Sequence, residues 1–167
     1  MRLSAALIAV FLFTVPIAHA ADDLFTRPTL KGLRGVAVIV TPQSSEVQQN
    51  GLTTSAIQTD VELKLRQAGI PILELNLDNV SAPTFAQLHV NVSVFTHSDG
   101  IWPFAIRIDV SQAVSLKRDP SIVLNAATWD ETSYGMVGKQ NVRSVRDGVK
   151  GLVDKFINAY LAMNPKK

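Results

Sequence analysis

The sequence contains no cysteine, so the chain can form no disulfide and has no thiol that a bacterial lipoprotein would acylate. Charged residues make up only 18% of the chain and aromatic residues 7%, and no internal repeat or low-complexity tract is present. Hydrophobic residues make up 47%, which is enough for a substantial core. We therefore expect stability to come from burial within one domain rather than from cross-links.

An excess of charge of one sign is also lacking, since the formal net charge is +2 at pH 7. Basic residues gather after Lys139, where a solvated helix face explains them more simply than a nucleic acid does. His89 and His97 lie about 26 Å apart if the strand is extended, at ~3.3 Å per residue. No thiolate or paired carboxylate completes a zinc site there. We predict no nucleic-acid partner, no metal and no cofactor.

Residues 1–20 have the pattern of a secretory signal peptide. Arg2 precedes an apolar run, and Ala18-His19-Ala20 has the small-x-small pattern of a cleavage site. We predict cleavage after Ala20 and a periplasmic or secreted protein that is not a lipoprotein and keeps no transmembrane segment. Residues 21–34 are predicted to be a lead-in segment, and residues 35–167 a single α/β domain.

The central third of the chain, residues 85–116, is predicted to be a β-hairpin. Both arms alternate between apolar and polar residues, which is typical of strands with one buried face. Asp99-Gly100 favours a turn between the arms, because glycine adopts a positive φ without steric cost. The apolar positions are Leu88, Val90, Val92 and Val94 in the first arm and Phe104, Ile106, Ile108, Val110, Val114 and Leu116 in the second.

Two helices are predicted around this hairpin, at residues 53–68 and 141–163, each with an apolar stripe. Strands are predicted at residues 35–40, 71–75 and 121–132. The last of these alternates poorly, so it is either covered on both faces or bulged. Gly135 and Gly138 are predicted to form a loop. The expected fold is α/β (α+β): a two-layer sandwich with one mixed sheet of about five strands (β-α-β-β-β-β-α) and two helices on one face.

Gly148 and Gly151 lie inside the second predicted helix, where each costs about 1 kcal/mol relative to alanine. We predict that both face away from the apolar stripe, together with Ser144, Ala159 and Ala162. A thin surface face explains these small residues, and a close helix contact in a homodimer is the alternative.

With helices on one face, the other face of the hairpin is expected to be open to solvent or to a partner. His89, Asn91, Arg107 and Asp109 lie on this face and are candidate binding residues. Trp102 and Phe104 flank Pro103 near the hairpin tip, where they would anchor a partner or contact a membrane interface. The alternative is that Trp102 folds back over the end of the sheet.

No catalytic constellation is evident. His97-Ser98-Asp99 has the side chains of a hydrolytic triad, but three consecutive residues in a turn do not readily point at one another. The leading hypothesis is a non-enzymatic protein that binds a protein partner of the cell envelope. The alternatives are a hydrolase with a site in the Asp99 and Asp130 loops, and a small-ligand carrier with an apolar cavity between helix and sheet.

Three sets of residues are informative together: 33–36 with 58–70, 120–122 with 126–129, and 152–161. As a set they resemble a family of small exported bacterial proteins with no assigned activity. The resemblance spans residues 30–165. More remotely, the order of elements is similar to that of the periplasmic α/β domains of the curli secretion pore and of the Tol-Pal propeller protein. This resemblance implies an interaction role in the envelope and no catalytic residue.

Overall fold

The computed structural model describes residues 25–76 and 82–165. The predicted signal peptide and its cleavage site lie outside these residues. The elements in chain order are the 3-10 helix η1 (Arg27–Leu30), strand β1 (Ala37–Val40), helices α1 (Ser45–Gln49) and α2 (Thr54–Ala68), strands β2 (Gln87–Val94), β3 (Ile101–Leu116) and β4 (Asp119–Gly138), the 3-10 helix η2 (Lys139–Ser144) and helix α4 (Val145–Met163).

The strands form one open, mixed sheet in the order β1-β2-β3-β4. β1 pairs in parallel with β2, and the two remaining pairs are antiparallel. The α+β class and the mixed sheet are confirmed. Residues 71–75, predicted to be a strand, contribute only a single parallel bridge between Ile72 and Val36. Ile72 packs, partly buried, against the core, whereas Leu75 at the end of the segment is exposed.

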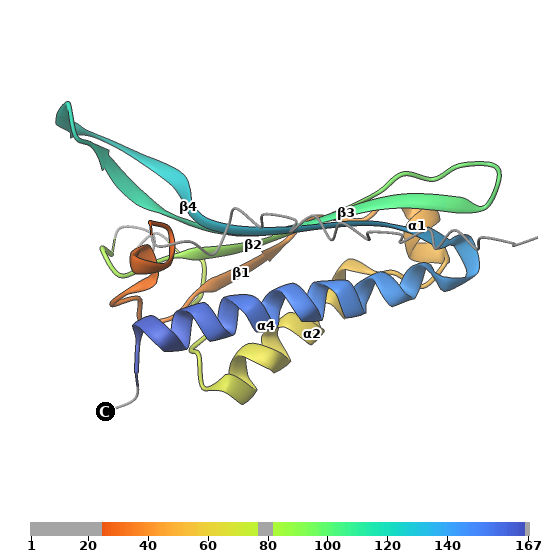
Figure 1. The fold of residues 1–167 in the computed structure, drawn as a ribbon, viewed down its shortest axis with the longest axis horizontal. Coiled ribbons are helices and arrows are strands. Elements are labelled where there is room, and N and C mark those ends of the chain that lie inside the picture. The colour runs from red at the N-terminus through yellow and green to blue at the C-terminus, as the bar shows by residue number, and fades with distance from the viewer. Residues whose placement is uncertain (1–24, 77–81, 166–167) are drawn as a thin grey trace, which may run out of the picture.

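Helices α2 and α4 pack side by side on one face of the sheet, which makes two layers (Figure 1). Thr53 caps α2 by accepting a hydrogen bond from the Ala56 N–H, and Gly69 ends it with a left-handed φ of 74°. All buried residues of α4 except Ala159 belong to the apolar stripe that the sequence predicts. The core between the layers includes Ile57, Val61, Leu65, Leu88, Val90, Ile106, Ile108, Val110, Val149, Val153 and Phe156.

The sheet face under the helices is set by the alternation of β2 and β3. In the observed register, Leu88 pairs with Val110 and Val90 with Ile108, and all four side chains are fully buried. Gly100 has a φ of 77° in the connecting turn, as the Asp99-Gly100 pattern predicts. The central hairpin is therefore confirmed, and its predicted face is buried at Leu88, Val90, Ile106, Ile108 and Val110. Val114 and Leu116 are only half-buried, beyond the last pair of β2 with β3.

Strand β4 is much longer than predicted, because it continues through the segment assigned to a Gly135–Gly138 loop. A Cβ on Gly135 would lie 2.5 Å from Cζ of Phe104 on β3, so glycine is needed here for packing inside a strand. Farther along the ladder, Val110 pairs with Trp129 but Ser111 pairs with Ala127. This bulge at residue 128 changes which residues share a face on its two sides, so the predicted strand at residues 121–132 is bulged, one of the two expected alternatives.

Residues 25–34 do more than lead into the sheet. Leu30 and Leu33 are buried in the core. The Tyr160 hydroxyl donates a hydrogen bond of 2.7 Å to the Leu33 carbonyl oxygen, and Asn164 Nδ2 donates to that of Leu30. Burial raises the pKa of Tyr160 above its ordinary value. This segment therefore holds the C-terminal end of α4 against the sheet.

The prediction that Gly148 and Ala159 face away from the sheet is wrong. A Cβ on Gly148 would lie 2.7 Å from Cδ1 of Ile106, and Ala159 is buried. Gly151, by contrast, has open space around its Cα. Gly148 thus allows α4 to approach β3 closely.

Candidate functional site

The face of the sheet opposite the helices carries a row of polar side chains across three strands. His89 pairs with Asp109 and Asn91 with Arg107 between β2 and β3, and Asp109 pairs with Asp130 on β4. The structure therefore brings together the four candidate binding residues that the hairpin alternation placed on one face, although Asp109 is buried there rather than open to solvent. Their role in binding stays a prediction.

Hydrogen bonds and charge pairs connect this polar row. Asn91 Nδ2 donates to Asp109 Oδ1 at 3.3 Å. Arg107 Nε lies 3.6 Å from Asp109 Oδ1 and 3.5 Å from Asp130 Oδ2, so one guanidinium faces two carboxylates. His89 Nε2 lies 3.1 Å from Gln87 Oε1. About half of the Arg107 side chain remains accessible to a partner.

Trp102 is not part of this surface. It is fully buried, and its Nε1–H donates to the His97 carbonyl oxygen at 3.1 Å. The expectation of an exposed aromatic anchor at Trp102 is wrong, because even-numbered residues of this part of β3 face the helices. Phe104 shares this parity and packs, partly buried, against the core. The alternative, in which Trp102 folds back over the end of the sheet, describes its position.

A group of apolar side chains lies at the end of the open face nearest the β2–β3 turn. Tyr134 is 77% and Met136 70% exposed on β4, and Pro103 on β3 pairs with Met136. Ile101 and Phe95 are also exposed, and together with Pro103 and Met136 they line a hollow of about 270 Å³. We name this group the end patch: Phe95, Ile101, Pro103, Tyr134 and Met136.

Sequence reasoning missed the end patch because residues 135–138 were assigned to a loop. Tyr134 and Met136 are two residues apart, which places them on one face once β4 is known to be a strand there. This spacing was the available signal. It became interpretable only with the pairing of β4 to β3.

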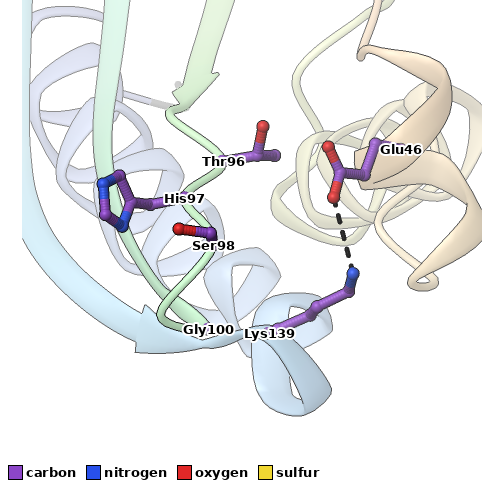
Figure 2. Close-up of a pocket in the computed structure, with 6 residues that line it drawn as sticks. All are labelled: Glu46, Thr96, His97, Ser98, Gly100 and Lys139. Carbon is purple, nitrogen blue, oxygen red and sulfur yellow. Dashed lines mark hydrogen bonds and ion pairs between the residues drawn. The ribbon is translucent and has the colours of Figure 1, made fainter.

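A second hollow, of about 230 Å³, lies beside the same turn and is polar (Figure 2). Lys139 Nζ lies 3.4 Å from Glu46 Oε1 across it, so the two charges partly neutralise each other. In Figure 2 the ring of His97 is turned away from this ion pair. The residues that line the hollow are Glu46, Thr96, His97, Ser98, Gly100 and Lys139.

His97 and Asp99 form an exposed pair within the turn, with Nδ1 3.2 Å from Oδ1. The Ile101 N–H donates to the Asp99 carboxylate, and this bond is the main reason why the pKa of Asp99 lies below its ordinary value. This arrangement stabilises the turn. Within residues 25–76 and 82–165, no group of three or more histidines, cysteines and acids lies close enough to hold a metal ion.

The two acids of the alternative hydrolase site lie far apart. Asp130 is eight residues from Gly138, which pairs with Ile101 beside the turn of Asp99. Along an extended strand this separation is about 26 Å. Asp130 lies within β4 rather than in a loop, and the structure does not bring it together with Asp99.

The adjacent acid, Glu131, points the other way. Its side chain is buried on the helix side, where Lys155 Nζ of α4 donates to Oε2 at 2.9 Å. Asp130 and Glu131 therefore serve opposite faces of the sheet. The space between helices and sheet, where a ligand carrier would need its cavity, is occupied by large, fully buried side chains that include Trp102, Trp129 and Phe156.

Together, the fold and this surface define an α+β protein with an open mixed sheet, one face covered by helices and the other available for contact. Among the described residues, no helix is both long and apolar enough to cross a bilayer.

No family model and no curated protein matches the chain. It is similar in fold to a dodecamer of a PelC point variant from Paraburkholderia phytofirmans, with a TM-score of 0.41, 17% identity and coverage of 77% of this chain and 90% of that one. It is also similar to a minor lipoprotein from Acinetobacter baumannii, with a TM-score of 0.42, 7% identity and coverage of 80% and 95%. The resemblance to a family of small exported proteins stays a prediction.

Proposed function

We propose that this protein is an exported, non-enzymatic binding protein of the bacterial cell envelope. It engages a protein partner through the open face of the sheet, with the end patch as the apolar anchor and the polar row around Arg107 as the orienting part. The secretory pattern of residues 1–20 supports export. The absence of a thiol to acylate favours a protein that is free in the periplasm or secreted.

The end patch is the observation that carries this proposal. In a strand, side chains that face solvent are usually polar, yet Tyr134 and Met136 are both more than two-thirds exposed beside Phe95 and Ile101. Aromatic residues and methionine are enriched at the centres of protein interfaces, and contiguous apolar patches on a soluble domain mark such sites. The hollow lined by Phe95 and Met136 offers space for a side chain of the partner.

The polar row provides what the end patch lacks. Apolar contact gives affinity but little orientation, whereas a half-exposed guanidinium between two carboxylates can form directed hydrogen bonds with a partner. We expect a partner that places an apolar side chain in the hollow and a carbonyl group near Arg107.

Site-specific photo-crosslinking in the native cell tests the proposal. A benzophenone amino acid replaces Tyr134 in one variant, and in the control it replaces Leu63, which is also exposed but lies on helix α2. We expect a discrete crosslinked protein band from position 134 that position 63 does not give. Adding the substitution Met136→Asp should abolish the band, because it places a charge in the hollow. Equal crosslinks from both positions, or a band unaffected by Met136→Asp, would contradict the proposal.

A further inference from the structure

The distal part of the β3–β4 hairpin projects from the body of the protein (Figure 1). Pairing between β2 and β3 ends at Gln87 and Ser111, whereas the β3–β4 ladder continues from Gln112 and Ala126 to Leu116 and Asp119. We name residues 112–126 the β-arm. Within the described chain no third strand pairs with it, and it lies at the opposite end of β3 from the end patch. A two-stranded ribbon of this kind is only marginally stable in water by itself.

The β-arm exposes a run of three consecutive apolar residues. Ile122 is 45%, Val123 63% and Leu124 41% exposed. Successive residues of a strand point to opposite faces, so the ribbon is apolar on both faces at this point. Such a run on a solvent-exposed strand is unfavourable unless something covers it. A narrow ribbon with two apolar faces suits a fluid layer that can close around it better than the flat surface of a folded partner.

The turn of the β-arm is basic. Lys117 and Arg118 are both exposed, and neither forms an ion pair with the described residues. The single acid beside them, Asp119, accepts hydrogen bonds from the backbone N–H and the hydroxyl of Ser121, so its carboxylate is directed back at its own strand. These cations are complementary to the phosphates of an anionic lipid surface, and the neighbouring aliphatic side chains are suited to contact with its acyl boundary.

We propose that the β-arm is a contact site for the surface of an anionic phospholipid bilayer. The arm lies along the interface, with the aliphatic side chains of residues 122–124 at the acyl boundary. Lys117 and Arg118 extend their long side chains to the lipid phosphates. The arm does not cross the bilayer, since its backbone groups stay within reach of water and headgroups.

Vesicle sedimentation tests the proposal on the mature chain, which begins at Ala21 if cleavage follows Ala20. The probes are vesicles of phosphatidylglycerol and phosphatidylethanolamine, compared with vesicles of phosphatidylcholine alone. The first variant replaces Ile122, Val123 and Leu124 by threonine, which keeps the strand propensity of the arm. The second is Lys117→Gln with Arg118→Gln. Matched controls are Leu63→Gln with Leu75→Gln for exposed apolar residues and Lys31→Gln with Arg34→Gln for exposed cations.

We expect the wild-type chain and both controls to sediment with the anionic vesicles. The threonine variant should partition roughly tenfold less, because it loses the aliphatic contact. The glutamine variant should lose most of the preference for anionic over neutral vesicles and its sensitivity to salt. Thermal unfolding of each variant checks that the body remains folded. All proteins begin at Ala21, so the apolar run of residues 1–20 makes no contribution to vesicle binding.

Two results would overturn the proposal. One is that the arm variants sediment like the wild type, or that the controls lose as much binding as they do. The other is that the wild type does not bind anionic vesicles. If light scattering then detects a complex of two or more copies that the threonine variant no longer forms, the β-arm is assigned to contact between copies of this chain.

Discussion

The two faces of strand β3 have very different surroundings although their residues alternate along one backbone. Ile106 and Ile108 are fully buried beneath the helices, while Arg107 between them is half exposed on the open face. Trp102 and Ile101 differ in the same way near the turn. The comparison shows that apolar character alone does not decide burial: Ile101 is as apolar as Ile106 but has no helix above it.

The largest expected effect is on the free energy of unfolding, when an aromatic residue is replaced by alanine on one face or the other. Trp129 is buried on the helix side and contacts Phe156 at a ring-centroid distance of 5.5 Å. Trp129→Ala should lower the free energy of unfolding by about 3–5 kcal/mol, because it leaves a cavity. Tyr134→Ala on the open face should change it by less than about 0.5 kcal/mol. Denaturant unfolding measures both variants.

A third variant refines this test. Trp129 Nε1–H is buried and has no hydrogen-bond partner among the described residues. Trp129→Phe should therefore cost less than about 1.5 kcal/mol, since it removes volume but no hydrogen bond. A loss as large as that of Trp129→Ala would mean that the indole N–H is bonded in solution.

The next effect concerns how the helix layer is held together. Arg146 of α4 donates two hydrogen bonds, of 2.7 and 2.8 Å, to the Asp60 carboxylate of α2. These bonds hold the pKa of Asp60 below its ordinary value of 3.8. A lowered pKa means that the stabilisation is present above about pH 4 and is lost as the pH falls through the pKa of the folded state.

Asp60→Asn should therefore lower the free energy of unfolding by about 1.5–3 kcal/mol at pH 7, and the difference from wild type should shrink below pH 4. Asp154→Asn is the control, because Asp154 pairs with Lys64 at an exposed site and should cost less than about 1 kcal/mol. A pH-independent effect of Asp60→Asn would exclude the ion pair as its cause.

The smallest effect compares the two glycines of α4. Gly151 faces open space, so Gly151→Ala should raise the free energy of unfolding by about 1 kcal/mol through helix propensity. Gly148 faces Ile106, and an added Cβ at 2.7 Å would force that side chain to move. Gly148→Ala should therefore gain less than Gly151→Ala, or lose stability. Equal gains at both positions would place Gly148 outside the contact between helix and sheet.

Much of the fold was predictable from local patterns. The alternation of Leu88 and Val90 with polar residues predicts a strand with one buried face, and the caps at Thr53 and Gly69 define α2 closely. These features depend on residues within a few positions of one another. Gly135 was misassigned because a glycine that makes room for Phe104 across a ladder looks in sequence like a turn glycine.

The candidate site was predictable only in part. Period-two alternation placed His89, Asn91, Arg107 and Asp109 on one face, because strand parity is local. The end patch depends on Phe95, Ile101 and Met136, which come from the β2–β3 connection, β3 and β4. No pattern within one segment brings them together. The division of Asp130 and Glu131 between two faces likewise depends on the register of β4 against β3.

The sequence by itself determined the two long helices, the central hairpin and which residues of that hairpin share a face, because these follow from the spacing of apolar residues along a backbone with a fixed period. Only the tertiary structure decided which face is covered, that β4 is one long strand, and that Trp102 is buried while Tyr134 and Met136 are exposed. Those outcomes depend on pairing and packing between residues distant in sequence, whose free energies no local pattern records.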